Sequence, residues 1–552
     1  MIGEVSQLAN DFWILLAMVI YFAAMLSIGF IYSKRSNSSS KEYFAGGRGV
    51  GPWLTALSAE ASDMSGWLLM GLPGLAYFTG AADPMWTAVG LALGTYLNWK
   101  LVARRLRRYS VVTDDAITIP DFFAKRFHDK KGVISTIAAV IILVFFSVYV
   151  GSCFVTVGKL FATLFGFDYH VMMIIGAVVV FVYTVVGGYL SVVMTDFIQA
   201  CSCSSRSRWC SSAPWPARAC RQHRGIPACH PRLPVRHAGG RAQAGPGHRP
   251  AARRGGQGRV RRASDYGIIT IISMLAWGLG YFGMPQVLVR FLSIRSVEEV
   301  RKSRIIATSW CVISLGCAVC IGLVGRAMMP TELLTSTDAE TIFIVLAQTL
   351  LPSFMCGVVV SGIFAASMSS SSSYLIIGAS AMGENIFRGL LHRKATDKQV
   401  MIVARVTLVV MFLFGILVAY DQNSSIFQVV SYAWAGLGAS FGPLMLCSLY
   451  WRRANKAGAV AGMLSGTAAV LIWHNLVKPL GGVFAIYELL PAFIISLLFI
   501  VVVSLLTAKP NKRMLYEFDH YMDDPLPGTL PSGTVLVDEP MEAMESEVRS
   551  GK

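Results

Sequence analysis

The sequence predicts an all-α polytopic membrane protein. Of its 552 residues, 54% are hydrophobic and only 14% are charged, whereas about 25% of the residues of a soluble domain carry a charge. Many of the hydrophobic residues gather in runs long enough to cross a bilayer, which takes roughly 20 residues of α-helix. These runs lack the alternation of a strand, and only helices satisfy the backbone of such segments in lipid.

Twelve apolar runs of spanning length follow one another along the chain. They cover residues 11–33, 50–77, 82–103, 133–164, 168–190, 266–292, 304–327, 342–383, 400–420, 426–450, 457–475 and 485–507. The run at 342–383 is long enough to include a re-entrant or interfacial portion before its helix. A basic stretch, not a cleavage site, follows the first run, so we expect a membrane helix there and not a signal peptide.

The loops between these runs alternate between basic and non-basic. Lysine and arginine gather near residues 34–48, 104–108, 301–304, 388–394, 452–456 and 509–513. Few cations occur in the loops at 78–81, 165–167, 328–341, 421–425 and 476–484. The positive-inside rule therefore puts the N-terminus outside and the C-terminal end in the cytoplasm. We expect residues 1–508 to form one transmembrane domain in the inner (plasma) membrane, followed by a polar cytoplasmic tail at 509–552.

One membrane crossing is missing from this count. The run at 168–190 is expected to end on the cytoplasmic side near Tyr189, and the run at 266–292 also ends there because basic residues follow it. The chain between them must therefore cross the bilayer once more, but residues 190–265 contain no apolar run. We expect that a thirteenth span has been lost at this point.

Residues 201–262 have the composition of a foreign segment. They contain fourteen arginines but no lysine, aspartate or glutamate, so they supply most of the net charge of +17 and the rest of the chain carries +3. Leucine codons read one base out of register give cysteine and serine, which matches the opening Cys-Ser-Cys-Ser-Ser. Shifted GC-rich codons give arginine, alanine, proline and glycine. We interpret the segment as frame-shifted translation of the lost span and its outer loop, and we expect this product to be poorly inserted or inactive.

Two alternatives for this segment stay open. The first is a genuine basic, disordered insertion that binds nucleic acid or lipid. The second is metal binding by Cys220, His223, Cys229 and His230, although their spacing matches no recognised zinc motif. The frameshift interpretation alone accounts for the arginine excess, the absence of acids and the missing span together.

The run at 50–77 carries polar residues where a lipid-facing helix would have leucine. Glu60 and Asp63 lie among serines, and Gly71-Leu72-Pro73-Gly74 follows them. A charged side chain at the bilayer centre costs at least ~2.5–3.5 kcal/mol, so it normally faces a partner, a cavity or an ion. Discontinuous helices expose carbonyl groups to a cation and N–H groups to an anion. We therefore expect a binding site here; a helix cap or a packing role for Asp63 is the alternative.

The run at 266–292 combines aromatic residues with residues that weaken a helix. Three glycines and Pro285 fall between residues 278 and 285, which permits the helix to unwind. Trp277 and Tyr281 are four residues apart, so we expect them to stack on one face of any remaining helix. Such a pair beside flexible backbone suits a small ring or aliphatic substrate. The alternative is an aromatic belt at the membrane interface.

Two later stretches are rich in small residues. Five consecutive serines, Ser369–Ser373, carry hydroxyl oxygens that suit a hard cation such as Na⁺. Serine also serves as a small contact between membrane helices, and taken alone packing is the better explanation for most of the five. We expect residues 431–443 to allow close helix packing and not to bind a ligand.

These four stretches, in this order, resemble the sodium:solute symporter family, most closely its proline-transporting members. The likeness covers about residues 11–200 and 266–508. It implies thirteen membrane spans, an N-terminus outside and a core of five-plus-five inverted repeats, in which the lost span is the last helix of the first repeat. It further implies sodium-coupled symport of L-proline into the cell by alternating access, with Na⁺ as the coupling ion and no other cofactor.

The resemblance also assigns roles to individual residues. It implies a sodium site made by the carbonyls of Ala61, Met64 and Ala366 and the hydroxyls of Ser369 and Ser370, with Asp63 as an electrostatic support. Family members often carry threonine where this chain has Ser370, which keeps the hydroxyl. The implied proline site is lined by Ser65, Gly66, Tyr149, Trp277, Tyr281 and Pro285. The resemblance puts Asp196 at the cytoplasmic start of the lost span and Arg48 on the cytoplasmic approach.

Other functions remain open from the sequence alone. Symport of a different small amino or organic acid is compatible with the same motifs. A non-transporting membrane sensor or scaffold would need a soluble signalling domain, and the tail at 509–552 is too short and polar for one. We expect no enzyme activity, because no catalytic constellation is present. The expected partners are L-proline, sodium and the lipid bilayer, and not nucleic acid.

Overall fold

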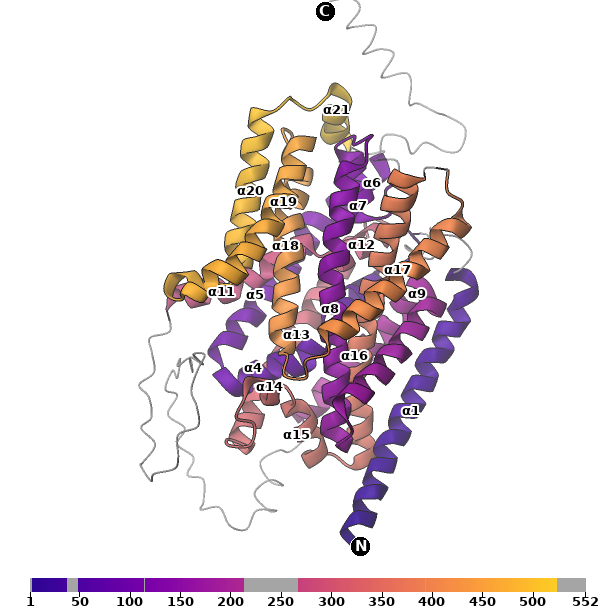
Figure 1. Cartoon of the computed structure of the whole chain (residues 1–552), viewed down its shortest axis with the longest axis vertical. Helices are drawn as coiled ribbons and strands as arrows, with labels where there is room; N and C mark the ends of the chain where they lie inside the picture. Colours follow the sequence, from indigo (N-terminus) through magenta and orange to yellow (C-terminus); the bar gives the residue numbers. More distant parts are fainter. Residues whose placement is uncertain (1, 37–47, 114, 213–266, 393, 524–552) are drawn as a thin grey trace, which may run out of the picture.

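The computed structural model of the chain is helical, as the composition predicts (Figure 1). It describes residues 2–36, 48–113, 115–212, 267–392 and 394–523. Within these ranges no strand occurs, and a parallel bridge joins Val50 to Ile294. The all-α prediction is therefore confirmed for the described part of the chain.

The helices fall on both sides of the gap at 213–266. Before it lie α1 (Ile2–Ser36), α3 (Pro52–Asp63), η2 (Trp67–Gly71), α4 (Leu72–Thr79), α5 (Ala82–Asn98), η3 (Trp99–Ala103), α6 (Arg104–Val112), α7 (Ile119–Arg126), α8 (Val133–Phe165) and α9 (Tyr169–Ser212). After it lie α11 (Ile268–Leu275), η4 (Ala276–Gly283), α12 (Pro285–Ser293), α13 (Val300–Met328), α14 (Ser336–Ala339), α15 (Ile342–Leu350), α16 (Ser353–Ser380), η5 (Ala381–Leu391), α17 (Asp397–Val418), α18 (Ile426–Tyr450), α19 (Lys456–Ile472), η6 (Trp473–Val477), η7 (Lys478–Leu480), η8 (Gly482–Ala485), α20 (Leu489–Leu506) and α21 (Lys512–His520).

Helices of membrane-spanning length occur throughout this series. In the described residues, seven helices are long and apolar enough to cross a bilayer. An eighth candidate consists of α11 and η4 followed by α12, with a bend of 44° between η4 and α12. All twelve runs predicted from the sequence lie on helical structure where they are described. Of the other four, two lie on the long helices α1 and α9, and two lie on the interrupted series α3–η2–α4 and α5–η3. The multi-pass architecture is thus confirmed, and the count of thirteen spans stays a prediction.

Several segments of the two classes of loop lie toward opposite ends of the molecule (Figure 1). Helices α6, α7 and α21, which carry or adjoin basic segments, lie together at the top of the view. Helices α4, α14 and α15, which adjoin the loops poor in cations, lie at the bottom. This separation is the arrangement that the alternation of loop charge predicts.

Helix α9 turns back on itself. The Tyr183 hydroxyl lies 2.6 Å from the Thr195 hydroxyl, whereas twelve residues of straight helix are about 18 Å long. The helical run must therefore reverse between them, where the sequence has Gly187-Gly188, and glycine pairs are a known cause of sharp kinks. The reversal lies where the run at 168–190 was predicted to end. The helix then continues to Ser212, inside the segment 201–262; the rest of that segment lies outside the described residues.

Helix η4 is packed tightly between α5 and α18. A Cβ atom at Gly278 would lie 2.1 Å from the carbonyl oxygen of Gly90 in α5, and one at Gly438 of α18 would lie 2.8 Å from the Cα of Gly280. Only glycine permits such approaches without displacing the neighbouring helix. The prediction that residues 431–443 serve close helix packing is confirmed at this contact.

The first part of the predicted tail is docked on the membrane domain. The Tyr521 ring stacks on Tyr109 of α6 with centroids 4.5 Å apart and planes 11° apart. Nη1 of Arg105 donates to the Tyr521 hydroxyl at 2.6 Å. Helix α21 and the residues up to 523 therefore belong to the folded body, while residues 524–552 lie outside the described part of the chain.

Candidate functional site

Two of the predicted spans are interrupted, and the interruptions meet. Helix α3 ends at Asp63, and Met64 leaves the helical conformation (φ −87°, ψ 76°) before η2 begins. Helix η4 ends at Gly283, and Met284 is extended (φ −80°, ψ 108°) before α12 begins. The Nε2 of Gln286 donates to Asp63 Oδ1 at 3.2 Å, which joins the two breaks. Interrupted helices leave backbone groups free to bind ligands, as the sequence predicted for both spans.

Oxygen atoms predicted to bind sodium come together beside the first break. The hydroxyls of Ser369 and Ser370 on α16 each lie 3.3 Å from the Ala61 carbonyl oxygen on α3. Ala366 lies one turn before Ser369 on α16, and Met64 follows Ala61 at the end of α3. All five residues are at most 7% exposed. The structure thus brings three of the five into direct contact and places the other two on adjoining turns, and an all-oxygen set of this kind suits a hard cation.

Asp63 lies buried at the same break. Besides the contact from Gln286, its backbone carbonyl accepts a hydrogen bond from Trp67 Nε1 at 3.3 Å. Its second carboxylate oxygen, Oδ2, has no hydrogen-bond partner among the described residues. The Tyr281 hydroxyl lies close enough to interact with this carboxylate, although not in standard hydrogen-bond geometry. A buried carboxylate oxygen without a well-formed hydrogen bond is costly, so Oδ2 can still accept a cation or a better-placed donor.

Asp196 approaches the same oxygens from α9. Its Oδ1 contacts the Ser369 hydroxyl, and its Oδ2 accepts a hydrogen bond from Ser58 Oγ of α3 at 2.7 Å. The Nη2 of Arg290 on α12 lies 3.1 Å from the same Oδ2. Ser369 therefore links the Asp196 carboxylate to the Ala61 carbonyl. Asp196 follows the reversal in α9, where the lost span was predicted to start.

Sequence reasoning missed three polar residues of this cluster. They are Ser58, Gln286 and Arg290, all at most 1% exposed. A signal for Arg290 was present, because an arginine within an apolar run marks a functional position in a membrane protein. Ser58 was part of the polar stretch in the first broken span. No sequence signal distinguishes Gln286, because a lone amide side chain has many structural uses.

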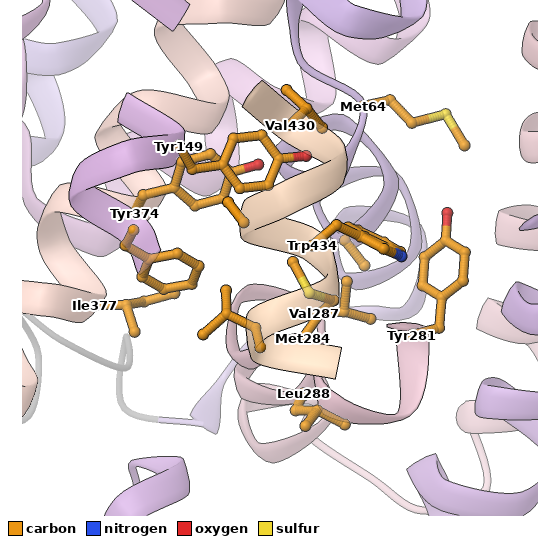
Figure 2. Close-up of a cluster of buried hydrophobic side chains, with 14 of the residues drawn as sticks. Met64, Tyr149, Tyr281, Met284, Val287, Leu288, Tyr374, Ile377, Val430 and Trp434 are labelled. Carbon is orange, nitrogen blue, oxygen red and sulfur yellow. The ribbon is translucent and has the colours of Figure 1, made fainter. Parts of the chain in front are cut away.

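An aromatic cluster includes residues of the second broken span, and Figure 2 shows two of its rings, Tyr281 and Trp434. The Trp277 ring stacks on Tyr487 with centroids 5.1 Å apart, and Trp434 Nε1 donates to the Trp277 carbonyl at 2.9 Å. Tyr281 meets Trp434 edge-on, with centroids 5.1 Å apart and planes 89° apart. Trp434, from the stretch expected only to pack, is thus a further ring of the cluster.

The predicted stacking of Trp277 and Tyr281 on one helix face is wrong. Helix η4 is a 3₁₀ helix, which has three residues per turn, so positions four apart differ by about 120° around its axis. The two rings do not share a face for this reason. They are instead joined through Trp434, which contacts both.

The remaining residues of the predicted proline site border the breaks. Ser65 and Gly66 form the link between α3 and η2. A Cβ at Gly66 would lie 2.4 Å from the Thr156 side chain, so the backbone of this link lies against α8. Pro285 is the first residue of α12, a position that needs no backbone N–H. Their part in binding a substrate stays a prediction.

Several buried polar groups around the breaks lack a hydrogen-bond partner of standard geometry among the described residues. They are Asp63 Oδ2, Gln286 Oε1 and the hydroxyls of Tyr149, Tyr281 and Tyr374. The rings of Tyr149 and Tyr374 pack together with centroids 4.4 Å apart (Figure 2). Buried polar groups are normally paired. A small ligand with one positive and one negative group could pair with these groups: its positive group with the carboxylate and amide oxygens, and its negative group with the hydroxyls.

Arg48 lies apart from this cluster. It forms an ion pair with Asp115 at 2.8 Å and donates to the Ala116 carbonyl at 2.8 Å. It precedes the bridge between Val50 and Ile294, which ties the start of α3 to the end of α12. The bridge joins the far ends of the two helices whose other ends form the breaks, and Arg48 ties the segment before α3 to the chain at Asp115 and Ala116.

Comparison with known proteins agrees with these features. The family model of the sodium:solute symporter family matches residues 43–202 and 262–466. The matched ranges exclude residues 203–261, which form most of the segment with the foreign composition.

Two named relatives are similar along most of their length. The chain is 39% identical over 501 residues to the osmoregulated proline transporter OpuE of Bacillus subtilis (strain 168), covering 90% of this chain and 96% of that protein. It is 40% identical over 513 residues to the sodium/proline symporter of Staphylococcus aureus (strain JH9), covering 92% of this chain and 95% of that protein.

Solved structures share the fold at low sequence identity. A Na⁺-coupled sialic acid symporter in a substrate-bound outward-open state matches with a TM-score of 0.67 and 19% identity, covering 91% of this chain and 99% of that chain. The nucleobase-cation-symport-1 family transporter MHP1, in a closed conformation, matches with a TM-score of 0.50 and 13% identity, covering 88% and 99%. These two likenesses bear on the fold alone.

Proposed function

Since the chain belongs to the sodium:solute symporter family, and is thus a multi-pass membrane transporter and not an enzyme, we propose that it couples the uptake of L-proline to the entry of sodium. The observation that carries this proposal is the contact of two α16 hydroxyls, from Ser369 and Ser370, with the Ala61 carbonyl beside the broken end of α3. The similarity to two proline transporters supports the choice of substrate.

The proposed sodium site uses the carbonyls of Ala61, Met64 and Ala366 and the hydroxyls of Ser369 and Ser370. Asp63 and Asp196 lie near these oxygens. Their negative charges attract a cation to the site, although neither carboxylate is one of the five proposed ligands. At a membrane potential of about −100 mV, entry of one Na⁺ contributes ~2.3 kcal/mol. This corresponds to a concentration factor of roughly 50 for the solute, at tenfold per ~1.4 kcal/mol.

The proposed proline site lies between the breaks. Backbone groups at Ser65 and Gly66 and the Oδ2 of Asp63, which lacks a hydrogen bond of standard geometry, offer polar contacts to the charged ends of an amino acid. Trp277 and Tyr281 offer apolar faces to the pyrrolidine ring, and Tyr149 and Pro285 border the same space. Sodium and proline bind together in this proposal, and the helices around them rock to open the site to alternate sides.

The proposed topology completes this mechanism. It has thirteen spans and a core of five-plus-five inverted repeats. The protein lies in the inner (plasma) membrane, with its N-terminus outside the cell and its C-terminus in the cytoplasm. The grouping of basic segments around α6, α7 and α21 supports this orientation. The two fold likenesses support the transporter core.

Residues 201–262 are proposed to impair this product. The family match stops and resumes around them, which supports the view that they replace a family segment. The segment contains fourteen arginines. Each arginine placed at the centre of the bilayer costs at least ~2.5 kcal/mol, so this segment is a poor substitute for a membrane span. The chain as coded is therefore expected to insert less efficiently than a version in which a Leu/Val-rich span replaces the segment.

The test is uptake of labelled proline into proteoliposomes that contain the chain as coded or the frame-restored version. We expect uptake by the restored protein to require a sodium gradient, to increase with an inside-negative potential and to be abolished when choline replaces sodium. Competition by unlabelled amino and organic acids establishes the substrate. Sodium-independent uptake of proline by the restored protein contradicts the coupling, and robust sodium-dependent uptake by the chain as coded contradicts the impairment.

A further inference from the structure

We propose that Arg290 is a built-in competitor of sodium for the charge of Asp196, and that it thereby sets the sodium affinity of the candidate site. This inference rests on the sodium coupling proposed above. It adds a positioning residue on α12 that none of the sequence motifs includes.

The side chain of Arg290 is buried among four helices. Its Nη2 lies 3.1 Å from Asp196 Oδ2 on α9 and 2.8 Å from Ser373 Oγ on α16. Its Nε lies 3.2 Å from Ser58 Oγ on α3. The side chain is 1% exposed, so water cannot screen this charge.

Asp196 is shared between Arg290 and the candidate sodium site. One carboxylate oxygen, Oδ2, receives Arg290 and the Ser58 hydroxyl. The other, Oδ1, contacts the Ser369 hydroxyl, whose oxygen lies 3.3 Å from the Ala61 carbonyl. A cation on the Ala61 and Ser369 oxygens would therefore lie on the opposite side of the same carboxylate from the guanidinium.

One carboxylate cannot fully compensate two buried cations. Charges interact more strongly where the effective dielectric constant is low, and both cations draw on the same negative group. With Arg290 in place, Asp196 attracts sodium less strongly than a free carboxylate would. This balance keeps sodium binding weak enough for release, which a transport cycle requires.

Arg290 also connects this balance to the proposed substrate side. Its Nη1 donates to the carbonyl of Gln286 one turn earlier on α12, at 3.0 Å. The Gln286 side chain in turn donates to Asp63 at the break of α3. A shift of the guanidinium away from Asp196 on sodium binding would thus act on the start of α12, directly after Met284.

The experiment measures binding of ²²Na⁺ to the purified, frame-restored full chain without proline, by scintillation proximity. We expect Arg290→Gln to lower the half-saturating sodium concentration about tenfold, because Asp196 loses its competing cation. Arg290→Lys keeps a positive charge and is expected to stay within about threefold of the unchanged chain. Arg126→Gln is the matched control, because Arg126 is a buried arginine that donates to the Ser448 carbonyl and forms no ion pair in the described structure.

Two further variants separate this role from a structural one. In the Asp196→Asn background, Arg290→Gln is expected to leave sodium affinity unchanged, because the shared carboxylate is gone. Ser373→Ala removes one partner of Nη2 without removing a charge, so Arg290 turns more fully to Asp196 and the half-saturating sodium concentration rises about twofold. Ser373→Ala decides the matter where Arg290→Gln does not fold.

The outcomes distinguish this inference from the function on which it rests. Absence of sodium binding to the unchanged and frame-restored chains would overturn the proposed sodium site, and this inference with it. Sodium binding that is unchanged or weakened by Arg290→Gln, or that is equally changed in the Asp196→Asn background, would overturn this inference alone. A fall of affinity in Ser373→Ala and a gain in Arg290→Gln support it.

Discussion

The Ser369 hydroxyl lies 3.3 Å from the Ala61 carbonyl oxygen, across the contact between α16 and α3. Ser370 makes the same contact, whereas the Ser371 hydroxyl donates to the Ser367 carbonyl of its own helix at 2.6 Å. The five consecutive serines therefore differ in their contacts: Ser369 and Ser370 face the broken helix, Ser371 and Ser372 donate to carbonyls of α16, and Ser373 accepts from Arg290.

Replacing Ser369 by alanine is expected to weaken sodium binding at least tenfold. The variant removes a hard oxygen ligand and also the link from Asp196 to the site. The half-saturating sodium concentration for proline uptake by the frame-restored protein is the measurement. Ser371→Ala is the matched control and should leave that concentration unchanged; an equal effect in both variants would assign the loss to packing.

Trp277→Ala is expected to raise the half-saturating proline concentration at saturating sodium by tenfold or more. The variant removes the ring that stacks on Tyr487 and lies beside Trp434. Loss of the apolar area and of the ring contacts that this side chain offers to proline is expected to cost about 1.4 kcal/mol or more of binding free energy. Proline-dependent uptake measures the effect, and Trp277→Phe should recover most of it. The half-exposed Trp53 is the control for loss of a tryptophan; a similar change in Trp53→Ala speaks against a substrate role.

Glu340→Gln is expected to lower the free energy of unfolding by about 3–5 kcal/mol, because the buried Lys159 then keeps only the Ser424 carbonyl and loses the negative charge that compensates its own. Lys159 Nζ lies 2.9 Å from Glu340 Oε2, and the two side chains are 9% and 2% exposed. Glu340 also accepts hydrogen bonds from the backbone N–H groups of Ile426 and Phe427 at the start of α18, at 3.1 and 3.0 Å.

Thermal unfolding in detergent checks this prediction. Glu299→Gln is the control: its ion pair with Arg295 lies in the link between α12 and α13, where the Arg295 side chain is 60% exposed, and should contribute only about 0–1 kcal/mol. Replacing both Lys159 and Glu340 by apolar or neutral residues should recover part of the loss. Equal melting temperatures for Glu340→Gln and the unchanged chain would show that the pair contributes nothing to stability.

Tyr521→Phe is expected to loosen the docked tail helix. The Tyr521 hydroxyl bonds both Arg105 and the Leu449 carbonyl, at 2.6 and 2.8 Å, and each such bond contributes about 1 kcal/mol. Faster tryptic cleavage between residues 509 and 523 is the readout. Tyr516→Phe is the control, because Tyr516 stacks on His520 within α21; equal cleavage rates in both variants would contradict a docking role for Tyr521.

Much of the fold could be predicted from the sequence because lipid restricts the choice of structure. Every apolar run of spanning length became helical, and the glycines before Pro285 did interrupt their span. The winding of η4 could not be predicted, because it depends on the close approach of α5 and α18 at Gly278 and Gly280. That winding is the reason why Trp277 and Tyr281 do not share a face.

The motifs of the site could be predicted from the sequence, but the contacts between residues of different helices could not. Residues of the broken spans stood out because polar groups are costly in lipid, and Asp63 and Ser369 were found in this way. Trp434 was not, because a tryptophan among small residues is an ordinary packing element. The contact of Arg290 with Asp196 joins residues 94 positions apart, and no local pattern encodes such a pair.

The reversal of α9 at Gly187-Gly188 has a genetic consequence. Asp196 follows the reversal and precedes residue 201, and every other residue of the proposed sodium and proline sites lies before Asp196 or after residue 262. If the intervening segment arose by a frameshift, the gene still encodes the whole binding machinery on both flanks. Because the family match resumes at residue 262, the reading frame must change at both ends of the segment. A revertant must therefore correct the frame at each end to regain transport, and growth on proline as sole nitrogen source would select it.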